Sequence, residues 1–192
     1  MSIDPPLPPT LLITPEPPDE AHFDVFLDRL RHAVSAGIAL VQLRAKTLDA
    51  FAYRELAEQA CAVCHRNGAR IVLNGPLDHL DDVDADGLHL PSARLGACKR
   101  RPLAPSKLLS AACHSRDQLL HAQRIGADFV TLSPVLPTPS HPGEPALGWP
   151  RFRTLAAQVS LPVYALGGMT PASASNAQAH GAYGIAGISA FW

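Results

Sequence analysis

Short apolar runs alternate with segments of helical periodicity along almost the whole chain. The first three runs are TLLIT at 10–14, IALVQLRAK at 38–46 and RIVLN at 70–74. Apolar residues recur three and four positions apart over about 21–36 and 49–67, and each of these segments ends at a glycine, Gly37 or Gly68. This spacing predicts helices that pack one face against the strands.

The alternation continues to the C-terminus. We expect a short helical piece at 77–82, a strand at 87–91, an irregular stretch at 92–105 and a strand at 107–114. A helix capped by Ser115 follows, then a strand near 129–135 and a helix over about 150–158. The last elements are a strand at 162–168, a helix begun by Thr170 and Pro171, and a strand within 183–192.

Eight strand candidates separated by helices or helical fragments predict an α/β fold, the (β/α)8 TIM barrel. The barrel must be compact, because 192 residues is fewer than the roughly 250 typical of this fold, and its last helix is missing after the final strand. An open doubly wound sheet is the alternative.

Length and composition fit a single barrel domain over 1–192, with MSIDPPLPP at 1–9 as an extended proline-rich arm. Hydrophobic residues make up 47% and charged residues 17%, and the net charge is −1. No field of one sign favours nucleic acid or a membrane, and no apolar run resembles a membrane span or a signal peptide. We therefore expect a cytoplasmic protein.

Two of the four cysteines form CAVCH at 61–65, the spacing of a c-type haem attachment site. A haem or zinc site is one interpretation. The other is that Cys61 and Cys64 are buried thiols on a helix, since both lie inside the helical pattern of 49–67.

Polar side chains gather at the C-terminal ends of the predicted strands, where a barrel carries its chemistry. Gln42, Arg44 and Lys46 alternate with apolar residues, so the three share one face of their strand. Because a buried barrel strand is normally almost continuously apolar, this face either looks into the mouth of the barrel or belongs to an exposed edge. Asn74, His89 and His114 lie in or at the ends of the next strands, although a lone histidine there is often only structural.

The ends of the seventh and eighth strands have the features of a phosphate site. Gly167 and Gly168 precede a capped helix, and Ile188 and Ser189 end the last strand. Backbone N–H groups in these loops suit phosphate, and Arg44 and Lys46 add positive charge. A small phosphorylated substrate follows from this arrangement.

The loop SPVLPTPSHPG at 133–143 is unusually stiff and rich in hydroxyl groups. Its four prolines exclude a helix or a central strand. It is either a rigid connector or a functional loop.

Together these segments resemble the thiamine phosphate synthase and TenI family over nearly the whole chain. The motifs that carry the resemblance are VQLRAK, IVLN, ADGLHL, AACHS, GADFVTLSPVLPT, ALGGMTP and GAYGIAGIS. GWPRF and SHPG are closer still to divergent members joined to Nudix hydrolases.

The resemblance implies a transferase of thiamine biosynthesis or salvage that joins an aminomethylpyrimidine pyrophosphate to a thiazole phosphate. Gln42, Arg44, Lys46 and Asn74 would then hold the pyrophosphate, and His89 would line the pyrimidine pocket. Thr138 and Ser140 would close over the phosphates as a lid. Backbone N–H groups of Gly167, Gly168, Ile188 and Ser189 would hold the thiazole phosphate.

The sequence departs from the family where its catalytic sets are expected. The two aspartates that bind Mg²⁺ in the synthases are replaced by Gly75 and Arg94, so a magnesium site is hard to build and we assign no metal ligand. The lysine of the lid is His141, and the histidine of the TenI tautomerase is Pro134. Arg94 either meets phosphate as a fixed cation or lies on a solvated loop.

These departures leave two functional hypotheses. One is a thiamine phosphate synthase-like enzyme, and the other is a non-catalytic barrel that binds thiamine phosphate or thiazole phosphate for a partner. Phe191 and Trp192 end the chain where no helix covers the last strand. We expect this apolar seam to be exposed in the monomer and covered in a homodimer or by a partner.

Overall fold

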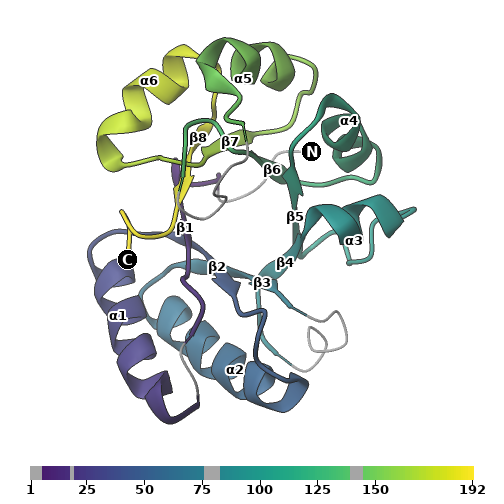
Figure 1. The fold of residues 1–192 in the computed structure, drawn as a ribbon. Helices are drawn as coiled ribbons and strands as arrows, with labels where there is room; N and C mark the ends of the chain where they lie inside the picture. Colours follow the sequence, from purple (N-terminus) through teal and green to yellow (C-terminus); the bar gives the residue numbers. More distant parts are fainter. Residues whose placement is uncertain (1–5, 18–19, 76–82, 139–144) are drawn as a thin grey trace.

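Eight parallel strands close into a barrel in the order of the sequence (Figure 1). This computed structural model describes residues 6–17, 20–75, 83–138 and 145–192. The strands are β1 Thr10–Ile13, β2 Leu40–Arg44, β3 Arg70–Asn74, β4 Gly87–Leu90, β5 Leu108–Cys113, β6 Phe129–Leu132, β7 Val163–Leu166 and β8 Gly184–Gly187. The predicted TIM barrel is confirmed, and the open sheet is excluded because β8 pairs with β1.

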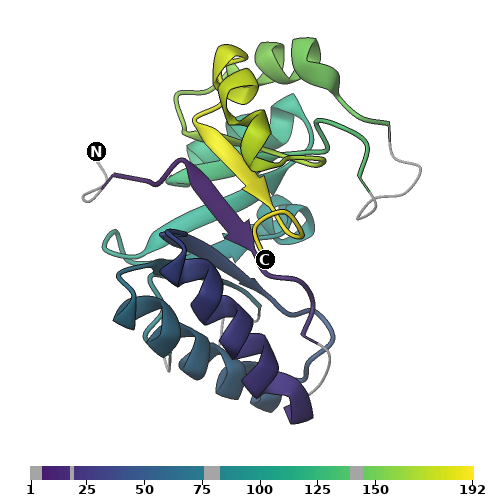
Figure 2. The ribbon, with the colours of Figure 1, turned by 90° about the vertical axis from the view of Figure 1, so that its left-hand side faces the viewer.

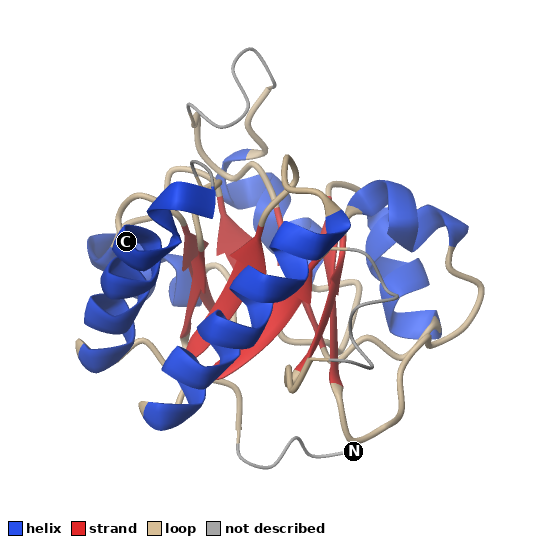
Figure 3. Ribbon diagram, turned by 90° about the horizontal axis from the view of Figure 1, so that it is seen from below, coloured by secondary structure: helices blue, strands red, loops and turns tan. Residues whose placement is uncertain are grey.

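Helices surround the barrel (Figures 1 and 3). They are α1 Phe23–Ser35, α2 Ala50–Arg66, α3 Ser92–Ala97, α4 Arg116–Arg124, α5 Gly148–Ala156 and α6 Ala174–Ala179, with 3-10 turns at Glu20–His22 and Pro171–Ser173. Ser115 is the N-cap of α4, as predicted, and its hydroxyl accepts from the N–H of Gln118. No helix in the described part of the chain combines the length and apolarity that a membrane crossing needs.

The prediction of an irregular stretch at 92–105 is wrong at its start, where α3 forms. This helix has six residues and buries one of them, Leu95, so it leaves no apolar periodicity to detect. The helical piece expected at 77–82 lies outside the described residues.

Cys61 and Cys64 lie buried on α2, as the helical interpretation predicted. Burial raises the pKa of the Cys61 thiol to about 12, and it raises the pKa of Cys64 as well. Both groups are thiols packed in the core, where burial disfavours the thiolate form.

The strands bury one face against the helices and the other inside the barrel. The inner cluster includes Leu11, Leu40, Phe129 and Tyr164, and it fills the end of the barrel where the strands begin. Leu7, from the described part of the proline-rich arm, joins this cluster, so the arm closes the N-terminal end (Figure 2). The pocket must therefore open at the opposite end, where the strands finish.

After β8 the described residues 188–192 form a turn and no helix. The expectation that Phe191 and Trp192 are exposed is wrong, because both are partly buried against the hydrophobic core that lies between the strands and the helices. The ring of Trp192 packs on Phe26 of α1, with centroids 4.8 Å apart. The last residues of the chain thus cover part of the outer face of β8, next to α1 (Figure 1).

Candidate active site

A pocket of about 730 Å³ opens where the strands end. Most of the predicted site residues lie around it: Gln42, Arg44, Lys46, Asn74, His89, Thr138, Gly167, Gly168, Ile188 and Ser189. Ser140 and His141 lie outside the described residues. Arg94 is not part of the pocket lining. The structure therefore gathers residues from six strand ends into one cavity, and their binding roles stay predictions.

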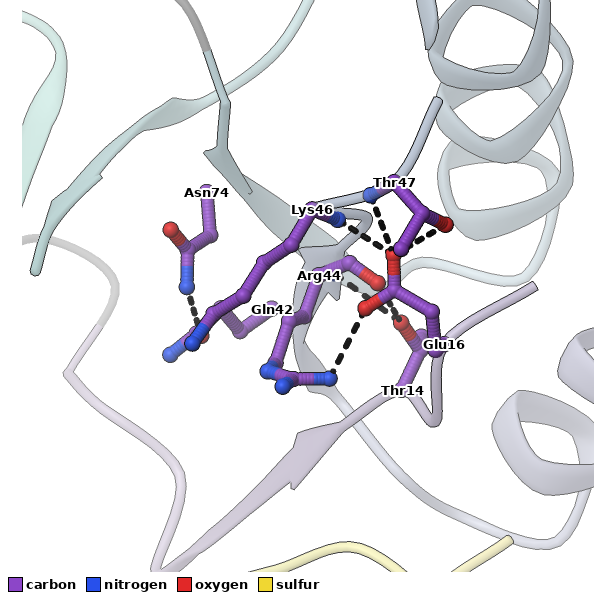
Figure 4. A network of polar contacts seen from close by, with 7 residues as sticks. All are labelled: Thr14, Glu16, Gln42, Arg44, Lys46, Thr47 and Asn74. Atoms are coloured by element: carbon purple, nitrogen blue, oxygen red, sulfur yellow. Dashed lines mark hydrogen bonds and ion pairs between the residues drawn. The ribbon is translucent and has the colours of Figure 1, made fainter.

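Two amides form the floor of the pocket beside β2 and β3. Asn74 donates from Nδ2 to Oε1 of Gln42 at 2.9 Å, and both side chains are buried. Among the described residues, Nε2 of Gln42 has no hydrogen-bond partner (Figure 4). A buried donor without a partner is costly, so this N–H is suited to an acceptor oxygen of a ligand.

Glu16, just after β1, organises the rim of the pocket and was not predicted. Its carboxylate accepts from Nη1 of Arg44 at 3.0 Å, from the N–H of Thr47 at 2.8 Å and from the Thr47 hydroxyl at 3.0 Å. It also accepts from the N–H of Lys46 (Figure 4). One side chain thus fixes Arg44 and the loop that carries Lys46. Its place at a strand end was the signal available in the sequence.

His89 lies deep in the pocket and is held in its neutral form. Its Nδ1 is 2.9 Å from the hydroxyl of Ser110, which also lies 3.4 Å from the carbonyl of Leu88. Burial lowers the pKa of His89 to about 3. A neutral imidazole carries one donor and one acceptor nitrogen, so it can bind a neutral heterocycle without placing a charge in the core.

His114 is a second histidine of the lining, at the end of β5. Its Nδ1 lies 2.9 Å from the carbonyl oxygen of Ser133. Because a carbonyl only accepts, Nδ1 carries the proton, and in the neutral ring Nε2 is left as an acceptor. The sequence pointed to this strand end but gave His114 no role.

Gly167 and Gly168 allow the loop after β6 to pack directly on the loop after β7. Both have positive φ, at 99° and 69°. A Cβ on Gly167 would lie 2.9 Å from Cα of Pro134, and one on Gly168 would lie 2.8 Å from Cβ of Leu136. The carbonyl of Gly167 accepts from the N–H of Leu136 at 3.1 Å. Only glycine fits this close approach, and both residues line the pocket.

The magnesium ion that the family resemblance implies does not fit the described residues at positions 75 and 94. A side chain at Gly75 would overlap the ring of Tyr53, whose hydroxyl oxygen would be 2.7 Å from the new Cβ. Arg94 donates from Nη1 to the carbonyl of Gly75, so a cation already lies there. Among the described residues that line the pocket, Glu16 is the single carboxylate, and both its oxygens accept hydrogen bonds.

Arg94 corrects one of the two alternatives drawn from the sequence. It is partly buried on α3 and donates to the carbonyl of Gly75, the residue after Asn74, so it does not lie on a solvated loop. It is not among the described residues that line the pocket.

Comparison with known proteins identifies the family. The model of the thiamine monophosphate synthase family (TMP-TENI) matches residues 10–191. The thiamine-phosphate synthase of Chlorobium luteolum is 36% identical over 166 residues, covering 85% of this chain and 78% of the relative. That of Syntrophomonas wolfei is 32% identical, covering 85% and 79%. The thiamine phosphate pyrophosphorylase of Pyrococcus furiosus has the same fold, with a TM-score of 0.74 at 24% identity over 94% of this chain and 85% of that one. The chain therefore belongs to the thiamine monophosphate synthase family.

Proposed function

We propose that the protein is a thiamine-phosphate synthase. It would join an aminomethylpyrimidine carrying a pyrophosphate ester to a thiazole phosphate, giving thiamine phosphate and free pyrophosphate. The C–O bond to pyrophosphate breaks, and the thiazole nitrogen supplies the electron pair for the new C–N bond. The observation that carries the proposal is one pocket lined both by cationic and amide donors from β2 and β3 and by the two glycines after β7.

The pyrophosphate would lie against β2 and β3. Arg44 and Lys46 supply positive charge, and Glu16 holds Arg44 in place. The unpartnered Nε2 of Gln42 supplies a donor at the floor, with Asn74 fixing the amide's orientation. These groups stabilise the charge that collects on the leaving pyrophosphate as the C–O bond breaks.

The pyrimidine would enter beside His89. This ring is neutral because of its burial, so it can hydrogen-bond the heterocycle without competing for its proton. Closure of the pocket over the reacting carbon would exclude water, which otherwise competes with the thiazole nitrogen for the activated carbon.

The thiazole phosphate would bind the backbone N–H groups of Gly167, Gly168, Ile188 and Ser189, which border the pocket at the ends of β7 and β8. Thr138 would close over the phosphates with Ser140, and His141 stands where the family's lid has lysine. The likeness to members joined to Nudix hydrolases stays a prediction.

A second candidate is a barrel that binds thiamine phosphate or thiazole phosphate without catalysis. It is favoured by one observation, the replacement of the two expected carboxylates by Gly75 and Arg94. Both candidates use the same pocket, so a turnover measurement separates them.

The experiment supplies purified protein with both substrates, with magnesium and separately with a chelator, and follows thiamine phosphate by chromatography. We expect product, with at least a tenfold lower kcat/KM in Arg44→Ala. The matched control is Arg124→Ala on α4, away from the pocket lining, which should leave turnover unchanged. Ligand binding without product would favour the non-catalytic barrel.

A homodimer, or a partner covering the seam beside β8, also stays a proposal. Its support is that the turn at 188–192 fills only part of the space beside β8, with Trp192 packed on Phe26. Sedimentation at high protein concentration should give a dimer, and a monodisperse monomer would refute it. We also propose a cytoplasmic setting, where the four free cysteines would stay reduced.

A further inference from the structure

Tyr53, Gly75 and Arg94 form one packed cluster behind the rim of the pocket. Tyr53 comes from α2 and is 1% exposed, and its ring fills the space of a side chain at position 75. Arg94 reaches from α3 and donates to the Gly75 carbonyl. The three residues come from separate elements and fit one another, so the loss of a carboxylate at 75 and the cation at 94 belong to a single arrangement.

The charged member of this cluster, Arg94, adds to the positive charge near β2 and β3, the side of the pocket proposed to bind the diphosphate. Among the described lining residues, Arg44 and Lys46 are cations and Glu16 is an anion. Counting the two histidines, His89 and His114, as neutral leaves one net positive charge. A diphosphate ester carries more than one negative charge, so these residues alone do not match it. Arg94 adds one more fixed positive charge, because its guanidinium is bonded to the carbonyl of Gly75, the residue after Asn74. A guanidinium keeps its charge at every pH of interest.

We propose that the Tyr53–Gly75–Arg94 cluster replaces a metal ion, so that the pocket binds a diphosphate without a divalent cation. Arg94 acts as a positioning residue: it holds the backbone after Asn74 and supplies its charge from behind the rim. A divalent cation brought to the same place would be repelled by Arg94, and the described residues of the cluster offer it no carboxylate. The proposal deepens the proposed function, but it concerns binding and is tested without turnover.

The experiment is calorimetric titration of the intact protein with inorganic pyrophosphate, once in a chelator and once in millimolar magnesium chloride. We expect binding in the chelator, with a Kd no more than threefold weaker than in magnesium. Binding that requires magnesium, or that is more than tenfold tighter with it, would overturn the proposal. So would the absence of binding in both conditions. Either result leaves the turnover experiment to decide the proposed function separately.

Variants at position 94 isolate the role of the fixed charge. Arg94→Gln keeps a donor for the Gly75 carbonyl but loses the charge, so it should weaken pyrophosphate binding in the chelator by about three- to tenfold. Arg94→Lys keeps the charge and should bind within about threefold of the unmodified protein. Arg100→Gln removes an exposed cation just after α3 and serves as the control for net charge. Equal affinity of Arg94→Gln and Arg100→Gln would overturn the role of Arg94, and the lysine variant keeps this test valid if the glutamine variant misfolds.

Discussion

Replacing Glu16 by glutamine tests whether one carboxylate holds the rim of the pocket together. The carboxylate now accepts from Arg44, from the N–H groups of Lys46 and Thr47, and from the Thr47 hydroxyl. Glutamine keeps one acceptor oxygen, but its amide nitrogen would face Nη1 of Arg44, donor against donor. The change therefore removes the ion pair and weakens the remaining bonds without changing the volume of the side chain.

The stability that Glu16→Gln loses depends on how far solvent reaches the Glu16–Arg44 ion pair. Hydrogen bonds to charged groups contribute about 1.5–3 kcal/mol and neutral ones about 0.5–1.5 kcal/mol, so each weakened bond loses roughly 1 kcal/mol before solvent screening. Glu16 is 27% exposed and Arg44 is 28% exposed, which reduces the total. We expect Glu16→Gln to lower the free energy of unfolding by about 2 kcal/mol and Tm by about 4–8 °C.

The control is Glu58→Gln, which breaks a carboxylate–arginine pair with the same 3.0 Å separation on the surface of α2. Glu58 is 50% exposed and its partner Arg54 is 46% exposed, so this change should cost only about 0.3–0.5 kcal/mol. Urea unfolding and thermal scans of both variants make the comparison. Equal losses in the two variants, or no loss in Glu16→Gln, would refute the anchoring role of Glu16.

Three further changes test other parts of the account. His89 is neutral in the folded state, with its pKa lowered to about 3, whereas the unfolded group binds a proton below about pH 6.5. The free energy of unfolding should therefore fall by up to about 1.4 kcal/mol per pH unit between about pH 6.5 and pH 3, and urea unfolding should show this slope reduced in His89→Gln. Gly167→Ala should lower the free energy of unfolding by about 1–3 kcal/mol more than Gly181→Ala does, as measured by urea unfolding. Both glycines have positive φ, but only Gly167 contacts a neighbouring loop. Equal losses in the two variants would count against the loop contact. Trp192→Ala should lower stability by roughly 1–3 kcal/mol in thermal unfolding, and an unchanged Tm would contradict its packing on the core.

The pattern of neighbouring residues was enough to predict the strand β2 and the shared face of its polar side chains. An alternation of period two needs no knowledge of distant residues, and it placed Gln42 and Arg44 on one face of the strand and Val41 and Leu43 on the other. In the structure the polar face lines the pocket and the apolar face packs in the core. The capped start of α4 was predicted for the same reason, since Ser115 acts on a residue three positions away.

Contacts between distant residues set the limit of sequence reasoning. Glu16 bonds to Arg44 and Thr47, about 30 positions along the chain, and nothing in the residues around Glu16 indicates that partner. Tyr53 explains the glycine at 75 only once α2 and β3 are packed together. The family resemblance marked positions 75 and 94 as departures, but the structure was needed to bring them into contact.

The most direct test of the account is a crystal structure of the protein grown with thiamine phosphate and pyrophosphate, the two proposed products, in the presence of a chelator. We predict the phosphate of thiamine phosphate at the N–H groups of Gly167, Gly168 and Ser189, and the pyrimidine ring beside His89. Pyrophosphate should contact Gln42 Nε2 and Arg44, with Arg94 still bonded to the Gly75 carbonyl. Ligands bound outside this pocket, or a thiamine phosphate whose phosphate lies on Arg44 rather than on the glycine loop, would contradict the account.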